Sequence, residues 1–294
     1  MRYWLASALL VAAPTLVLAH TVSPYILPEQ FDSKEDSLSL QSAMTVEKFF
    51  VPSNNFKTSY QLTDPAGKTS VVEAAASLTR FNVAEVNTPA DGTYRLRTTN
   101  TPGSINKYAL IDGNWIRVRP ARAQAAQPAK ADSKTGGEVA ARPAGQPPRF
   151  VTEDQIPAKA KVLETVNIPI AETFITKGKP SPIPDISGQG FEVKLLTHPN
   201  ELYANDALKA QVFMDGKPVP GLKFEVFKGL SSYERDAEGA KSSVTTNDKG
   251  EFELKFDQPG IYLITTAYPA AKPDRTKQPA AKTYSYGLSV EVTE

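Results

Sequence analysis

The chain has 294 residues, of which 33 are basic, 32 are acidic, 2 are histidine and none is cysteine. Without cysteine it can form no disulfide, thiolate zinc site or cysteine nucleophile. The balanced charge argues against a nucleic-acid partner, whose binding needs a concentrated basic field, and two histidines exclude a multi-histidine metal cage. The length indicates about two domains.

Residues 1–19 are predicted to be a secretory signal peptide. Arg2 provides the positive end, an apolar run extends from Trp4 to Leu18, and Ala19 completes a site of the kind that signal peptidase cleaves. The run of about 15 residues is shorter than the ~20 that a spanning helix needs, which favours cleavage after Ala19 over a retained anchor. No later segment is apolar over that length, so we expect an exported protein located in the periplasm.

Short alternating segments separated by turn residues predict an all-β first domain over residues 20–119. One of its clearest strands places Tyr94 and Leu96 on one face and Arg95 and Arg97 on the other. Near the end of this domain, a turn of the Asp-Gly-Asn type predicts a β-hairpin.

An abrupt change of composition follows. Residues 120–160 begin with a stretch dominated by alanine, with proline, glycine, lysine and glutamine, and are predicted to be a flexible insertion. Strand-forming residues resume at 161–177, which we assign to the first domain as a returning strand. The proline-rich residues 178–190 are predicted to link this domain to the next.

Residues 191–294 contain about seven short strands separated by turns, which is typical of an immunoglobulin-like sandwich. A Gly-x-Tyr element occurs in both domains, ending at Tyr94 and at Tyr262. A tyrosine at a sandwich corner that bonds back to the upstream backbone accounts for both. The fold class expected is therefore all-β, with two β-sandwich domains.

Several segments together resemble one family. They are Leu27-Pro28, Phe191–Leu195, His198–Leu202, Val212–Gly221, Thr245–Gly250 and Gln258–Tyr262. The chain is similar to a periplasmic two-β-domain family of unknown function, the domain of unknown function 4198, often labelled as a component of nickel or cobalt uptake. The resemblance implies an exported, non-enzymatic accessory role in metal handling, with a metal transport system at the cell envelope as partner. It provides no catalytic residues.

The two histidines are the candidate metal ligands. Cleavage after Ala19 makes His20 the amino terminus, where one residue presents both an α-amine and an imidazole. Such nitrogen pairs suit copper(II) or nickel(II), and His198 is the one imidazole available to complete a two-histidine site. Mixed ligation with a carboxylate such as Glu29 or Asp32 stays open, as does the interpretation that both histidines are structural.

We expect no enzymatic activity. The sequence has no Gly-x-Ser-x-Gly elbow and no phosphate-binding glycine loop, and paired carboxylates such as Glu153 and Asp154 fall in expected loops. Two alternatives stay open: an envelope scaffold or adaptor for a glycan or protein, and an oxidative copper enzyme with a histidine brace formed by His20 and His198.

Overall fold

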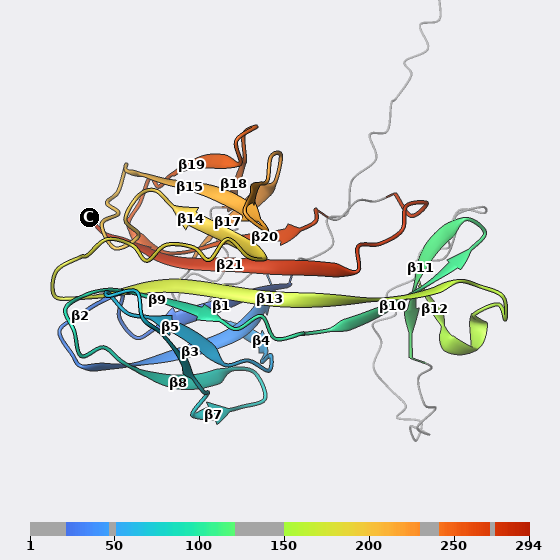
Figure 1. The fold of residues 1–294 in the computed structure, drawn as a ribbon, viewed down its shortest axis with the longest axis horizontal. Coiled ribbons are helices and arrows are strands. Elements are labelled where there is room, and N and C mark those ends of the chain that lie inside the picture. The colour runs from blue at the N-terminus through green and yellow to red at the C-terminus, as the bar shows by residue number, and fades with distance from the viewer. Residues whose placement is uncertain (1–21, 47–50, 121–149, 230–240, 271–273) are drawn as a thin grey trace, which may run out of the picture.

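The computed structural model describes residues 22–46, 51–120, 150–229, 241–270 and 274–294. Within these ranges the regular structure is β-strand, apart from a short 3₁₀ helix (Figure 1). The fold class expected from the sequence, all-β with two sandwiches, is confirmed. The predicted signal peptide lies outside the described residues. No helix among the described residues is both long and apolar enough to span a bilayer.

The first sandwich packs two groups of strands around a core that includes Ile26, Leu40, Tyr60 and Leu96. One sheet contains β1 (Val22–Pro28), β3 (Ser37–Val46), β8 (Asn82–Asn87), β7 (Ala76–Ser77) and β4 (Pro52–Asn54). The facing strands are β2 (Asp32–Ser33), β5 (Tyr60–Thr63), β6 (Thr69–Val72), β9 (Gly92–Thr98) and the end of β13 (Val162–Lys177). Alternation of buried and exposed residues, as in the first half of β3, produces this two-layer arrangement.

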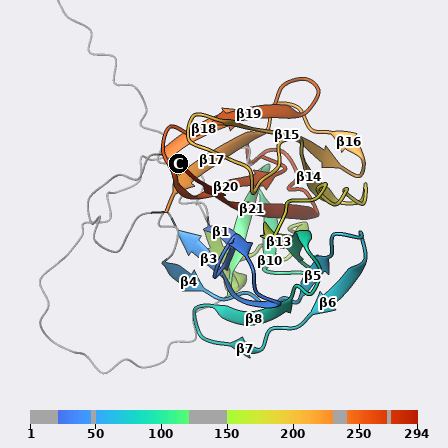
Figure 2. The ribbon, with the colours of Figure 1, turned by 90° about the vertical axis from the view of Figure 1, so that its left-hand side faces the viewer.

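The second sandwich has a larger core, which includes Phe191, Val212, Phe224 and Leu288. One sheet contains β14 (Phe191–Leu195), β15 (Ala207–Met214), β16 (Lys217–Pro218) and β19 (Glu251–Lys255). The facing strands are β17 (Lys223–Lys228), β18 (Lys241–Thr245), β20 (Gly260–Tyr268) and β21 (Lys282–Val292). Figure 2 shows the two sandwiches stacked, with β21 and β13 between their outer sheets.

The long strand β13 joins the two sandwiches into one 12-stranded sheet. Its residues 166–173 pair in parallel with β21 of the second sandwich, and residues 174–177 then pair antiparallel with β9 of the first. The returning strand expected at 161–177 therefore reaches the first sheet only with its last residues. Its middle, residues 166–173, is hydrogen-bonded to the second sandwich through β21.

A close contact between β1 and β21 adds to this junction. A Cβ atom at Gly287 would lie 1.9 Å from the carbonyl oxygen of Pro24, so only glycine allows the two backbones to approach this closely. Next to it, the hydroxyl of Thr265 donates a hydrogen bond of 2.7 Å to Ser23. The two sandwiches are therefore held together by backbone packing as well as by the shared strand.

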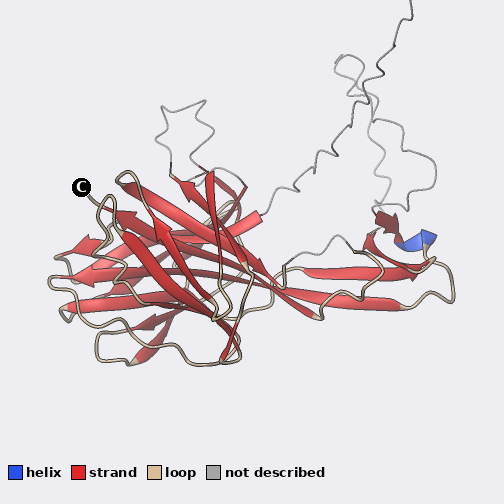
Figure 3. Cartoon of the chain, turned by 90° about the horizontal axis from the view of Figure 1, so that it is seen from above, coloured by secondary structure: helices blue, strands red, loops and turns tan. Residues whose placement is uncertain are grey.

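An arm projects from the sandwiches (Figures 1 and 3). It consists of the first part of β13 with β10 (Ile105–Ile111), β11 (Asn114–Arg119), β12 (Phe150–Thr152) and η1 (Glu153–Gln155). The predicted hairpin is present as β10 and β11, but it builds this arm and not the sandwich. Residues 150–160, expected to be part of the flexible insertion, include β12 and η1, because Val151 packs in the small apolar cluster of the arm. The rest of that insertion, residues 121–149, lies outside the described residues.

Both predicted tyrosine corners are present. The hydroxyl of Tyr94 donates to the carbonyl of Ala90 at 2.8 Å, and that of Tyr262 donates to the carbonyl of Gln258 at 2.7 Å. In each case the acceptor lies four residues upstream. The same local hydrogen bond, from a tyrosine hydroxyl to the upstream backbone, therefore fixes one corner of each sandwich.

Candidate functional site

A cleft of about 540 Å³ opens between the two sandwiches. The first sandwich lines it with residues of β5, β6 and β9, including Gln61, Thr69 and Arg97. The proline-rich connection and the start of β14 line the other side, with Ser187 and Glu192 among them. The lining is mostly polar, and the position of the cleft between two domains makes it the first candidate for a binding site.

Two arginines occupy the bottom of the candidate site. Arg95 and Arg97 alternate with the core residues Tyr94 and Leu96 on β9, as the sequence predicts. The face that carries the arginines is covered by the second sandwich and its connection, so each residue is only 7% exposed. Arginine is almost never buried to this extent without partners, so the groups around each guanidinium decide what the site can do.

Arg95 has a buried anionic partner. Its Nε donates a short hydrogen bond to the carboxylate of Glu172 on β13, and the hydroxyl of Tyr286 on β21 donates to the same carboxylate at 2.7 Å. Burial acts to lower the pKa of Arg95, but the charge of Glu172 and its hydrogen bond raise it. Burial, together with the negative charge of Glu172, holds the pKa of Tyr286 well above its usual value.

Arg97 and Glu192 form the second part of the cluster. The carboxylate of Glu192 accepts hydrogen bonds from the backbone N–H groups of Ser187, Gly188 and Gln189 at 2.8, 2.7 and 3.1 Å, and from the Ser187 hydroxyl at 2.9 Å. Arg97 Nη2 donates to the carbonyl of Phe191 at 2.8 Å, while its Nη1 is 3.8 Å from Glu192. Glu192 therefore holds the connection in place and is fully occupied by donors.

Donors remain in excess in this cluster. Nη2 of Arg95 and Nε of Arg97 are buried and have no hydrogen-bond partner among the described residues. An unpaired buried donor costs about 1–3 kcal/mol, and more when the group is charged. The cluster is therefore incomplete as it stands: both arginines line the cleft, and their two unpaired N–H groups lie beneath its surface.

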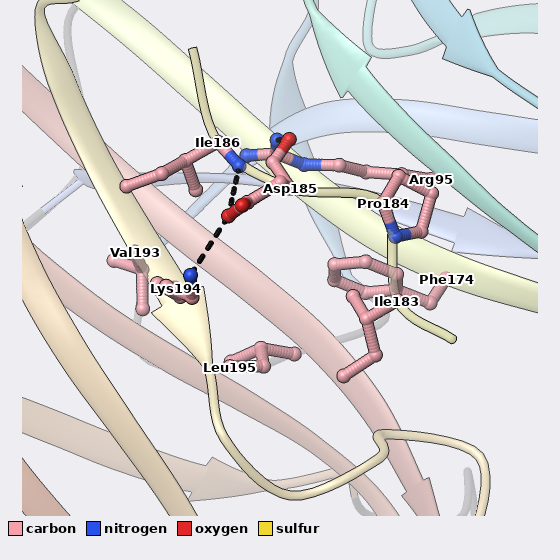
Figure 4. Close-up of a pocket in the computed structure, with 9 residues that line it drawn as sticks. All are labelled: Arg95, Phe174, Ile183, Pro184, Asp185, Ile186, Val193, Lys194 and Leu195. Atoms are coloured by element: carbon pink, nitrogen blue, oxygen red, sulfur yellow. Dashed lines mark hydrogen bonds and ion pairs between the residues drawn. The ribbon is translucent and has the colours of Figure 1, made fainter. Parts of the chain in front are cut away.

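A smaller pocket of about 30 Å³ adjoins the cleft behind Arg95 (Figure 4). Figure 4 shows Arg95 extending past Pro184 towards Asp185, whose carboxylate is 2.9 Å from Lys194 Nζ. The hydrogen bond from Lys194, with a second from the backbone N–H of Ile186, lowers the pKa of Asp185. This pair attaches the outer edge of the cleft to β14.

His198, one of the two predicted metal ligands, lies at a different point between the sandwiches. Its Nε2 is 3.0 Å from the Thr93 hydroxyl and 3.1 Å from the carbonyl oxygen of Ser181, and the backbone N–H of Asn200 donates to Nδ1 at 3.3 Å. Because a carbonyl oxygen only accepts, Nε2 carries the proton and Nδ1 is the acceptor. Both ring nitrogens are thus engaged in holding the connection, β9 and the second sandwich together.

Of the other predicted ligands, the structure describes Asp32 and Glu29. His20 lies outside the described residues. Burial raises the pKa of Asp32, and the nearby His198 only partly opposes this. The carboxylate of Glu29 accepts a hydrogen bond from the backbone of Ser39. Within the described part of the chain, no three histidine, aspartate or glutamate side chains are grouped so as to hold a metal ion.

Sequence reasoning did not identify Arg95, Arg97 or Glu192 as site residues. The alternation within β9 was evident, but an arginine face on a strand normally faces solvent. Two arginines on one face of a central strand, next to a core face, were the pattern that could have indicated a buried polar site.

The fold and the cleft define a class: an all-β protein of two joined sandwiches with a polar cleft between them. The chain belongs to the family described as a domain of unknown function, DUF4198, whose profile matches residues 17–270. The resemblance inferred from the sequence is thereby confirmed. No curated protein matches the sequence.

Solved structures share only low similarity with the chain. The D0–D1 domain of intimin is 11% identical, with 93% of this chain and 99% of that chain covered and a TM-score of 0.22. A trypsin-activated alpha-2-macroglobulin from Escherichia coli is 8% identical, with 93% and 16% covered and a TM-score of 0.23. A DUF4785 family protein from Legionella pneumophila is 8% identical, with 90% and 55% covered and a TM-score of 0.23. These scores assign no function to the chain.

Proposed function

We propose that the chain is an exported, non-enzymatic accessory protein of the periplasm that binds a small molecule in the cleft between its two sandwiches. The observation that carries the proposal is the pair of buried arginines with unpartnered nitrogens in a cleft of about 540 Å³. Small-molecule sites have volumes of roughly 300–1,000 Å³ and occur preferentially between domains. Arginine keeps its proton, so these groups hold a ligand and do not transfer protons to it.

Blocking the cleft tests this function. Thr69 lies on β6 at the cleft wall, and Thr69→Trp fills the cleft without entering the core. Ser39→Trp places the same side chain at an exposed position of β3, away from the cleft, and is the matched control. Native mass spectrometry of protein isolated from the periplasm measures any small molecule that remains bound. We expect a bound mass in the wild type and Ser39→Trp and its loss in Thr69→Trp; equal retention in both variants would contradict the proposal.

Export has its own test. Amino-terminal sequencing of the protein from a periplasmic fraction should begin at His20. A chain that begins at Met1, or that stays in the cytoplasmic fraction, would exclude both the periplasmic location and a chelating terminus.

A metal site at the amino terminus is the second candidate, with nickel, cobalt or copper as the ion. What favours it is the position of His20 two residues before β1, whose pairing with β3 starts at Val22. Cleavage after Ala19 would give this terminus an α-amine and an imidazole on one residue, a nitrogen pair that suits these ions. This function would make the chain an accessory component of a metal transport system.

Calorimetric titration of the processed protein with each of the three ions tests the metal site. We expect His20→Ala to abolish tight binding. The matched variant His198→Ala distinguishes a terminal site from a two-histidine site, because only the latter needs both residues. Equal weak binding by wild type and His20→Ala would contradict the metal proposal.

A further inference from the structure

We infer that the ligand of the cleft carries an oxyanion, a carboxylate or a phosphate ester, on a polar, hydroxyl-bearing body, and that Arg95 and Arg97 receive the oxyanion. This inference rests on the proposed function, since it assumes that the cleft binds a small molecule. Its starting point is that the unpaired groups of the buried cluster are all cationic donors.

The acceptors of the cluster are already in use. Both carboxylate oxygens of Glu172 receive a hydrogen bond, one from Arg95 and one from Tyr286. Those of Glu192 receive four donors from residues 187–189. The other carboxylate of the cleft lining, Asp185, is 2.9 Å from Lys194 Nζ. A cationic ligand would therefore meet carboxylates that already have partners, whereas an anion meets two arginines whose Arg95 Nη2 and Arg97 Nε atoms have none among the described residues.

The spacing of the two arginines suits one oxyanion. They are two residues apart on the same face of β9, so their backbones are separated by about 6.4–6.8 Å. Guanidinium groups approaching from that distance can share a carboxylate or phosphate, and charged N–H···O⁻ bonds are about twice as strong as neutral ones. The site therefore recognises the anion through directed donors.

The uncharged polar side chains of the cleft lining indicate the chemistry of the rest of the ligand. Their amides and hydroxyls both donate and accept hydrogen bonds, and they belong to Gln61, Thr63, Thr69, Asn100 and Gln189. Hydroxyl groups of a ligand have the same dual capacity. A sugar acid or a sugar phosphate combines both features and is of a size that fits about 540 Å³.

Three probes that differ in one group test the inference: glucuronate, glucose 6-phosphate and glucose. Calorimetry measures binding to the processed full-length protein, and NMR of the arginine Nε–H groups shows whether Arg97 is contacted. We expect at least one of the two anionic probes to bind and to shift the Arg97 resonance, and glucose to bind at least about tenfold more weakly. Which anion binds decides between a carboxylate and a phosphate.

Variants make the test specific. Arg97→Lys keeps the charge but loses the planar donors, and we expect at least about tenfold weaker binding of the anionic probe. Arg80→Lys makes the same change at an exposed position outside the cleft and should leave binding unchanged. Thermal unfolding of both variants checks that each is folded.

The outcomes separate this inference from the proposed function. Three results would overturn the oxyanion assignment. Glucose could bind as tightly as the anionic probes, the Arg97→Lys variant could bind the anionic probe as tightly as the wild type, or neither anionic probe could bind. The bound mass that Thr69→Trp removes would still support the proposed function in each of those cases. If that mass is also unaffected by Thr69→Trp, both fail together.

Discussion

Two clusters of buried polar side chains between the sandwiches, one around His198 and one around Arg95 and Arg97, differ in how completely they are hydrogen-bonded. At His198 both ring nitrogens have partners, from β9, the connection and the following turn. At the arginine cluster each oxygen of Glu172 and Glu192 accepts at least one hydrogen bond, yet Arg95 Nη2 and Arg97 Nε have no partner among the described residues.

This difference separates a structural junction from a binding site. A buried polar group with all its hydrogen bonds made contributes to a unique arrangement of the domains, and it offers nothing to a ligand. A buried cation with an unpaired donor is costly, so an acceptor at that point would be favourable. The comparison therefore points away from the histidine and towards the arginines among the described residues.

The largest effect is expected for Glu172→Gln. This change leaves Arg95 buried without its charge partner and should lower the free energy of unfolding by about 3–5 kcal/mol. Urea denaturation measures it, with Glu253→Gln as the control, because that residue's pair with Lys209 is exposed and is worth at most about 1 kcal/mol. Similar losses in both variants would show that the arginine cluster is not a buried charge network.

Tyr286→Phe should cost about 1.5–3 kcal/mol, because it removes a hydrogen bond to a buried carboxylate. Tyr262→Phe removes a hydrogen bond to the neutral carbonyl of Gln258 and should cost about 1 kcal/mol. Denaturant unfolding of the two variants side by side measures the difference. A greater loss at Tyr262 would contradict a special role for the charged cluster.

His198→Ala should lower stability by about 1–2 kcal/mol, through the hydrogen bonds lost at Ser181, Thr93 and Asn200. The exposed Tyr203→Ala is the control and should change stability by less than about 0.5 kcal/mol. Binding of the anionic probe should be unchanged in both. Loss of probe binding in His198→Ala alone would show that the two polar sites act as one.

The smallest effect is expected for Asp32→Asn, next to His198. Burial raises the folded-state pKa of Asp32 above its value in the unfolded chain. The neutral carboxyl therefore stabilises the folded state at a pH below the unfolded-state pKa, and this contribution is lost as the pH rises through the raised folded-state pKa. At pH 7 the variant should be slightly more stable, by less than about 0.5 kcal/mol, because Asp32 is only partly buried and keeps contact with solvent. The advantage should disappear as pH falls below about 4. Thermal unfolding across this pH range measures it, and an advantage that grows towards low pH would reverse the assigned sign.

Local patterns predicted the strands well. Alternation on β9 correctly separated Tyr94 and Leu96 from the two arginines, and the Gly-x-Tyr elements correctly predicted hydrogen bonds from Tyr94 and Tyr262 to the upstream backbone. These features depend on residues within a few positions of each other, so they can be inferred from the chain alone.

The sequence by itself determined the all-β class, the two sandwiches and their tyrosine corners, because period-two alternation and turn residues act over short distances. Only the tertiary structure decided what covers each face. The pairing of β13 with both β21 and β9 brings Glu172 to Arg95, and the position of β14 brings Glu192 near Arg97. The partners of these arginines are 77 and 95 positions away (172 − 95 and 192 − 97), and no local pattern encodes such pairings. The same long-range packing supplies the hydrogen-bond partners of His198. The sequence had singled out this residue as a metal ligand because it is one of only two histidines in the chain.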